Sequence, residues 1–220
     1  KKIYKAAKKS KQVERKLDQA VSNLLTLIDK KKEPLDNVDL ESQDKLAQHA
    51  AEESMVLLKN DGALPLDKKE RLLVLGPFAK SMRFQGAGSS KINPTKVTNL
   101  LEALDLDNID YRYLPLYEFD GKTIIDHDKE VLSELIESYD KVLLTIGLPE
   151  TFESEGFDRL HLHLPKNQLD MIEFLSQFKK PLVSVLFTGS PVAMPFLGNI
   201  DALLNAYLPG QAGGIAIKRL

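Results

Sequence analysis

The sequence predicts an α/β fold, specifically a three-layer α/β/α sandwich built around a mostly parallel sheet. Short runs such as 72–75 and 142–146 are almost entirely apolar, which is typical of strands buried on both faces of a sheet. These runs alternate with segments in which apolar residues recur every three or four positions, the pattern of βαβ units. The 220 residues, 43% of them hydrophobic and 28% charged, suffice for one α/β domain with a sizeable core.

Two helices are expected before the first strand. In the segment 11–30 the apolar residues form one stripe, and a polar connector that contains Pro34 follows at 30–40. A second helix is expected at 41–59, so the sandwich is expected to occupy residues 41–220 with a helical linker before it. The expected inward face of the second helix comprises Leu46, Ala47, Ala50, Ala51, Ser54 and Leu58.

The rest of the chain is expected to alternate between strands and helices. Four strands are mostly apolar and one has alternating apolar residues; they are expected at 71–75, 109–114, 141–146, 181–187 and 202–208. Helices are expected at 95–104, 127–139 and 166–178, the last led by Pro165, which is favoured at a helix entry. The helix 127–139 is expected to turn Val131, Leu132, Leu135 and Ile136 inward.

Composition excludes several functional classes. A net charge of −2 argues against a nucleic-acid binder, although residues 1–32 hold eleven Lys/Arg and only three Asp/Glu, which we interpret as a solvated helix face. No apolar run approaches the ~20 residues of a membrane span. The lack of cysteine excludes disulfides, cysteine-based zinc sites and a thiol nucleophile, and with the high lysine content it favours a cytoplasmic location.

Loops that follow the carboxyl ends of parallel strands are where such sheets bind ligands. The loop 147–164 is the most informative, because it crowds several carboxylates beside glycine and aromatic residues. Neighbouring carboxylates raise one another's pKa, and a carboxyl with a raised pKa can act as a general acid near neutral pH. The alternative is a solvated acidic loop in which Arg159 is a local salt-bridge partner.

Two further patterns are weaker. The glycine-rich segment 85–90 has amides that could hold a phosphate, but it lacks the spacing of a dinucleotide fingerprint or a P-loop. His161 and His163 would face one side of an extended segment, but only Asp158 lies near as a third ligand, so no metal is expected.

Four segments occur in an order and spacing that resemble one enzyme family. They are 51–66; 73–77 with 86–90; 153–159 with Leu164, Pro165 and Gln168; and 207–214. Together they resemble the C-terminal α/β sandwich domain of glycoside hydrolase family 3, the β-glucosidase family. The resemblance covers residues 41–220 and implies that residues 1–40 are the terminal helix and linker of a preceding barrel domain. It also implies a sandwich that is cut short at its C-terminal end.

The resemblance implies retaining hydrolysis of β-linked glycosides without a cofactor. In this family the barrel supplies an aspartate nucleophile, and the sandwich supplies the acid/base glutamate. Retention needs two carboxyl groups about 5–5.5 Å apart, so the sugar would lie between the two domains. Glu155 is the implied acid/base residue and Glu153 is the alternative, since loop lengths vary here.

The resemblance also implies substrate-binding residues. The loop with Gln85, Gly86 and Ser89 would line the leaving-group subsite. This chain has no tryptophan, so Phe152 or Phe157 would supply an aromatic wall. Arg159 is counted with these residues and is expected to pair with Asp158 and hold the loop's shape.

Three hypotheses about the function follow. In the first, the chain is part of a β-glucosidase-like enzyme, its partners are a β-linked glycoside and the barrel, and alone it is inactive. In the second, it is a flavodoxin-like module that holds a small anion or nucleotide at 85–90 and 188–190. In the third, it is a structural domain of an inactive homologue. The sugar, the linkage and the oligomeric state stay open.

Overall fold

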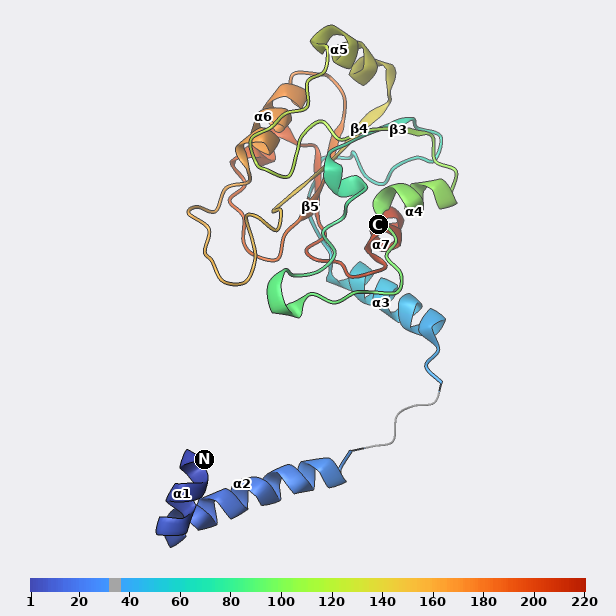
Figure 1. Ribbon diagram of the computed structural model, residues 1–220. Coiled ribbons are helices and arrows are strands. Elements are labelled where there is room, and N and C mark those ends of the chain that lie inside the picture. Colours follow the sequence, from blue (N-terminus) through green and yellow to red (C-terminus); the bar gives the residue numbers. More distant parts are fainter. Residues whose placement is uncertain (32–36) are drawn as a thin grey trace. The chain divides into compact units, whose positions relative to one another are not determined.

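The computed structural model describes residues 1–31 and 37–220, which divide into two units, 1–39 and 40–220 (Figure 1). The first unit contains α1 (Lys2–Lys9) and α2 (Lys11–Asp29), neither of which buries a residue. The helix predicted at 11–30 is therefore confirmed as α2, whereas part of the predicted connector lies outside the described residues. No described helix combines the length and apolarity needed to cross a membrane.

The second unit is built on one sheet in the order β1-β6-β5-β4-β2-β3. All neighbouring strands are parallel except β1, which pairs antiparallel with β6 at the edge. The strands are β1 (Val56–Asn60), β2 (Leu72–Leu75), β3 (Tyr111–Leu114), β4 (Lys141–Gly147), β5 (Leu182–Phe187) and β6 (Ala202–Asn205). The predicted mostly parallel sheet is confirmed.

Helices cover both faces of this sheet, as the α/β/α prediction requires (Figure 1). On one face α4 and α7 contact each other, and Leu104 and Ile217 line an apolar groove with Leu143 and Val183 of the sheet. The other face carries α5 and α6. The helices of this unit are α3 (Leu40–Ser54), α4 (Leu100–Leu106), α5 (Lys129–Ser138), α6 (Lys166–Leu175) and α7 (Gly213–Arg219), with short 3₁₀ turns at Pro77–Ala79, Gly88–Ser90 and Pro195–Asn199.

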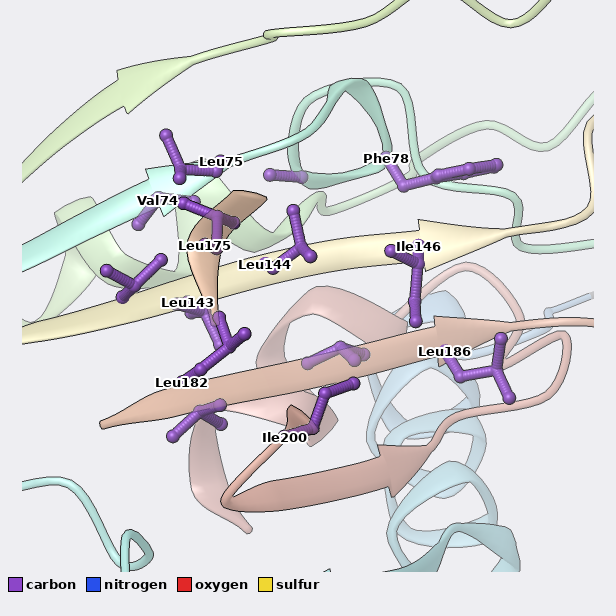
Figure 2. Close-up of a cluster of buried hydrophobic side chains, with 14 of the residues drawn as sticks. Val74, Leu75, Phe78, Leu143, Leu144, Ile146, Leu175, Leu182, Leu186 and Ile200 are labelled. Atoms are coloured by element: carbon purple, nitrogen blue, oxygen red, sulfur yellow. The ribbon is translucent and has the colours of Figure 1, made fainter. Parts of the chain in front are cut away.

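The core lies along the central strands. Every residue of β2 and β5 is buried, and in Figure 2 side chains of β2, β4 and β5 gather with Leu175 of α6 and Ile200. Burial of each such side chain contributes about 1.5–3 kcal/mol of transfer free energy. This explains why the central strands are mostly apolar in the sequence, with Thr145 and Ser184 as buried exceptions.

The topology places a ligand crevice at one position. From β2 the chain continues to β3 on one side, and then crosses to β4 on the other side of β2. Crevices in such sheets open at the carboxyl ends of the two strands where the winding changes direction. The loops that follow β2 and β4 therefore meet at this switch point.

The predicted helix 41–59 is wrong beyond Ser54. The helix α3 ends there, and Val56, Leu57 and Lys59 pair with β6, about 145 residues further along the chain. This edge strand exposes 41% of Leu58, and the helix exposes 59% of Leu46, so neither belongs to a buried face. The pairing depends on long-range hydrogen bonds that the helical spacing of the segment conceals.

Other predicted boundaries shift by a few residues. The helix predicted at 95–104 begins at Leu100, because Asn99 caps it and forms a reciprocal capping box with Glu102. The strand predicted at 202–208 ends at Asn205. Val131 was predicted to point inward but is 63% exposed, since α5 is only partly covered.

Candidate active site

The loop that carries the predicted acid/base residues begins at Gly147, the last residue of β4. The buried side chain of Gln168, near the start of α6, accepts a hydrogen bond from the Gly147 amide (2.9 Å) and donates one to its carbonyl (2.8 Å). A neutral amide thus satisfies both backbone groups where the sheet ends, as buried polar groups require. The loop therefore leaves the sheet from a fixed point.

Glu153 is held in a network with a buried arginine. Its Oε2 lies 2.5 Å from Nη1 of Arg83, and that side chain is only 6% exposed. Arg83 also donates to the carbonyls of Leu148 (2.5 Å) and Glu153 (2.8 Å), while the Gly189 amide donates to Oε2 of Glu153 (2.9 Å). These contacts join the loops that follow β2, β4 and β5.

The network keeps Glu153 ionised. Burial raises the pKa of its carboxyl, but the Ser190 side chain, the Gly189 amide and the Arg83 guanidinium together outweigh that effect, so the pKa lies below the ordinary value of 4.5. A proton on Glu153 would weaken its charge-assisted hydrogen bonds. Glu153 is thus arranged to hold the loop rather than to give up a proton.

Glu155 has different surroundings. It is exposed, and its Oε2 accepts hydrogen bonds from the Ser89 amide (2.7 Å) and the Ser89 hydroxyl. The hydroxyl, and then the amide, lower the pKa of the Glu155 carboxyl. Ser89 follows β2 and Glu155 follows β4, so the contact bridges the switch point of the sheet.

The segment around Ser89 is itself braced. The side chain of Gln85 bonds to both backbone groups of Ile92, with Nε2 donating to the carbonyl (2.9 Å) and Oε1 accepting from the amide (3.0 Å). Lys91 contacts Glu150 of the neighbouring loop at 3.0 Å. Gln85 therefore closes this loop, while its predicted contact with substrate stays a prediction, as does that of Gly86.

The predicted aromatic and arginine residues separate into different roles. Phe152 packs against the core beside Gly121, where any side chain would collide with its ring, while Phe157 is 50% exposed. Arg159 donates to the carbonyl of Pro191 (2.6 Å). Its predicted pairing with Asp158 is wrong, since no ion pair joins these two residues in the described part of the chain.

The two histidines of the loop show no metal-binding arrangement among the residues that the structure describes. The rings of His161 and His163 lie 5.7 Å apart between centroids. Within residues 1–31 and 37–220 no group of three His, Cys, Asp or Glu side chains is arranged to hold a metal ion.

Comparison with known proteins identifies the family. The model of the "Glycosyl hydrolase family 3 C-terminal domain" matches residues 55–220. The chain belongs to this family. This glycoside hydrolase family 3 domain shares 38% identity with a β-glucosidase structure from Bifidobacterium adolescentis, with a TM-score of 0.77 over 84% of this chain and 28% of that one.

Curated relatives of this family 3 domain are glycosidases. The chain is 39% identical to thermostable beta-glucosidase B of Acetivibrio thermocellus, over 99% of this chain and 30% of the relative. It is 36% identical to an exo-alpha-(1->6)-L-arabinopyranosidase of Bifidobacterium longum, over 91% and 28%. The chain thus spans less than a third of the length of these enzymes.

Sequence reasoning missed Arg83 as a site residue and gave Gln168 no role. Arg83 lies between Met82 and Phe84 with no local pattern around it, and its partners are 65 or more residues away. The available signal was its place in a loop after a buried strand. Gln168 follows Pro165 by one helical turn, which hints that it faces the end of the preceding strand.

Proposed function

We propose that this domain supplies Glu155 as the general acid/base of a retaining glycosidase, and that the nucleophile lies on a separate barrel domain. The observation that carries the proposal is the difference between the two glutamates of one loop. Glu153 is bound to a buried arginine, whereas no ion pair in the described part of the chain involves Glu155. An acid/base residue must reach the glycosidic oxygen, and of the two glutamates Glu155 is the exposed one.

The protonation state fits a shared active site. In the isolated domain Ser89 holds the Glu155 pKa below its usual range, which suits a base and opposes an acid. A nucleophile carboxylate about 5–5.5 Å away would raise that pKa through like-charge repulsion. Glu155 would then be protonated for the first step and, once the nucleophile is esterified, ionised for the second.

The substrates we propose are β-linked glycosides, with β-glucosides as first candidates. This follows the names of relatives, which include beta-glucosidase and exo-1,4-beta-xylosidase. Because the proposal puts the nucleophile on the barrel, the 220-residue chain alone is expected to hydrolyse no glycoside.

The alternative of an anion-binding module has less support. Its candidate sites were the amides of 85–90 and 188–190. The Ser89 and Gly189 amides instead donate to the carboxylates of Glu155 and Glu153. A bound anion would have to displace these two side chains of the same chain.

The test compares a complete enzyme that contains this domain with the chain at equal concentration, using p-nitrophenyl β-glucoside, β-xyloside and α-L-arabinopyranoside. Only the complete enzyme should be active. Glu155→Gln should then lower its turnover by about 10²–10⁴-fold on alkyl glycosides, whose poor leaving groups need a proton.

Asp158→Asn is the matched control, because Asp158 is an exposed carboxylate of the same loop and is given no role in the site. It should leave turnover nearly unchanged. Full activity of Glu155→Gln on alkyl glycosides would refute the proposal and point to the alternative, Glu153, as the acid/base residue.

A further inference from the structure

The turn that carries Ser89 is shaped to meet Glu155. Gly88 has φ +85°, a backbone conformation that residues other than glycine rarely adopt. A Cβ built on it would lie 2.5 Å from Cβ of Glu155. The glycine therefore lets the backbone of the turn lie directly against the glutamate. This close approach is what brings the Ser89 amide within 2.7 Å of Oε2.

Ser89 and Glu155 both lie in segments that are held by further contacts. The Gln85–Ile92 hydrogen bonds close the loop that carries Ser89, and Lys91 ties that loop to Glu150. On the other side, Glu155 lies between two anchored residues, because Glu153 is bound by Arg83 and Arg159 is bound to Pro191. The Glu155 backbone is thus anchored on both sides, and Ser89 holds its side chain.

The two hydrogen bonds from Ser89 reach the same oxygen. Both the amide and the hydroxyl donate to Oε2, which leaves Oε1 without a donor among the described residues. A carboxylic acid protonated on Oε1 still accepts both bonds through Oε2, so the contact persists in either protonation state. The bonds are stronger to the ionised form because they are then charge-assisted.

We propose that Ser89 is a positioning residue for the acid/base Glu155, holding Oε2 so that Oε1 exchanges the proton with the substrate. This rests on the proposed function of Glu155. In the first step the proton on Oε1 passes to the glycosidic oxygen while the bond from that oxygen to the sugar breaks and the nucleophile carboxylate bonds to the sugar. In the second step Oε1 takes a proton from water, whose oxygen displaces the nucleophile.

The charges near Glu155 leave Ser89 as the main influence on its ionisation. The other charged or titratable side chains of the two loops are the Glu150–Lys91 and Glu153–Arg83 pairs, Lys80, Lys96, Asp158, Arg159, His161 and His163, and none of them contributes to the shift of the Glu155 pKa. The Ser89 hydroxyl and then its amide lower the Glu155 pKa, and only slight burial opposes them. Loss of the hydroxyl should therefore raise that pKa.

The first arm of the test uses the 220-residue chain, with ¹³C NMR titration of the Glu155 carboxyl. Ser89→Ala should raise the Glu155 pKa, and Ser89→Thr, which keeps a hydroxyl, should restore it. Ser90→Ala is the matched control, since no hydrogen bond joins Ser90 to Glu155 in the described residues. Equal Glu155 titration curves for Ser89→Ala and Ser90→Ala would overturn the proposal.

The second arm uses the complete enzyme and pH profiles of kcat/KM on an alkyl β-glucoside. The alkaline limb reports loss of the acid's proton, so Ser89→Ala should move it to higher pH and lower kcat roughly tenfold, as expected when a charge-assisted hydrogen bond is lost. A merely structural role would lower stability without moving the limb, and an unmoved limb would overturn the proposal.

The two arms also separate this inference from the proposed function. If Glu155→Gln stays active while Ser89→Ala still raises the Glu155 pKa in the chain, then the assignment of Glu155 as the acid/base has failed. If Glu155→Gln is inactive while Ser89→Ala matches Ser90→Ala in both arms, then the inference about Ser89 has failed.

Discussion

Two neighbouring parts of one loop, around Glu153 and around Glu155, place the same type of side chain in different surroundings and therefore in different roles. Glu153 is 17% exposed in its side chain and faces a guanidinium that is almost fully buried. Glu155 is exposed and faces only neutral donors of Ser89. The comparison teaches that the role of each carboxylate in an acidic loop depends on its partner and its burial. The number of carboxylates in the loop does not reveal these roles.

The largest effect that would test this contrast is the loss of Arg83. Arg83→Met should lower the free energy of unfolding of the chain by about 3 kcal/mol, because the carboxylate of Glu153 is left without its buried partner. Urea unfolding at pH 7, followed by circular dichroism, measures it.

Lys91→Met is the control for that experiment, since Lys91 and Glu150 form an ion pair in which both side chains are about half exposed. Such pairs contribute about 0–1 kcal/mol. Equal changes for the two variants would mean that the Arg83 network does not anchor the loop.

The fold was largely predictable because its signals are local. Apolar runs such as Leu72–Leu75 must be buried on both faces, and the helical spacing between them indicates crossovers. The edge strand Val56–Asn60 was not predictable in this way, because it directly follows a helix and its partner Asn205 is remote in sequence. The helix start at Leu100 carried a readable signal, the Asn99–Glu102 capping box.

The site was predictable only in part. Family resemblance ranked Glu155 above Glu153, but it could not show what each one contacts. The bonds from Arg83 to Glu153 and from Ser89 to Glu155 join residues 66–70 positions apart. They arise from the switch point of the sheet, which brings the loops after β2 and β4 together. Strand order is a property of the whole chain and leaves no local pattern.

A smaller effect concerns pH. The folded protein favours ionised Glu153, so this residue contributes stability above the ordinary pKa of 4.5, and that contribution is lost as pH falls through its lowered folded pKa. Glu153→Gln should lower the free energy of unfolding by about 2 kcal/mol at pH 7, less than Arg83→Met, because the glutamine carbonyl can still accept from Arg83. The difference in unfolding free energy between Glu153→Gln and the unaltered chain should shrink below pH 4.5.

Urea unfolding of both proteins between pH 3 and pH 7 checks this pH dependence. Glu155→Gln should give a smaller change over the same range, because the Glu155 carboxylate is screened by water. A gap for Glu153→Gln that stays constant with pH would show that its ionisation is not linked to folding.

The central claim, that Glu155 rather than Glu153 exchanges the proton, is tested most directly by azide rescue in the complete enzyme. Glu155→Ala removes the base that activates water, so azide, which needs no base, should restore turnover of p-nitrophenyl β-glucoside and yield the β-glycosyl azide. Glu153→Ala, which still carries the base, should form no such product. Formation of β-glycosyl azide by Glu153→Ala and not by Glu155→Ala would contradict the account.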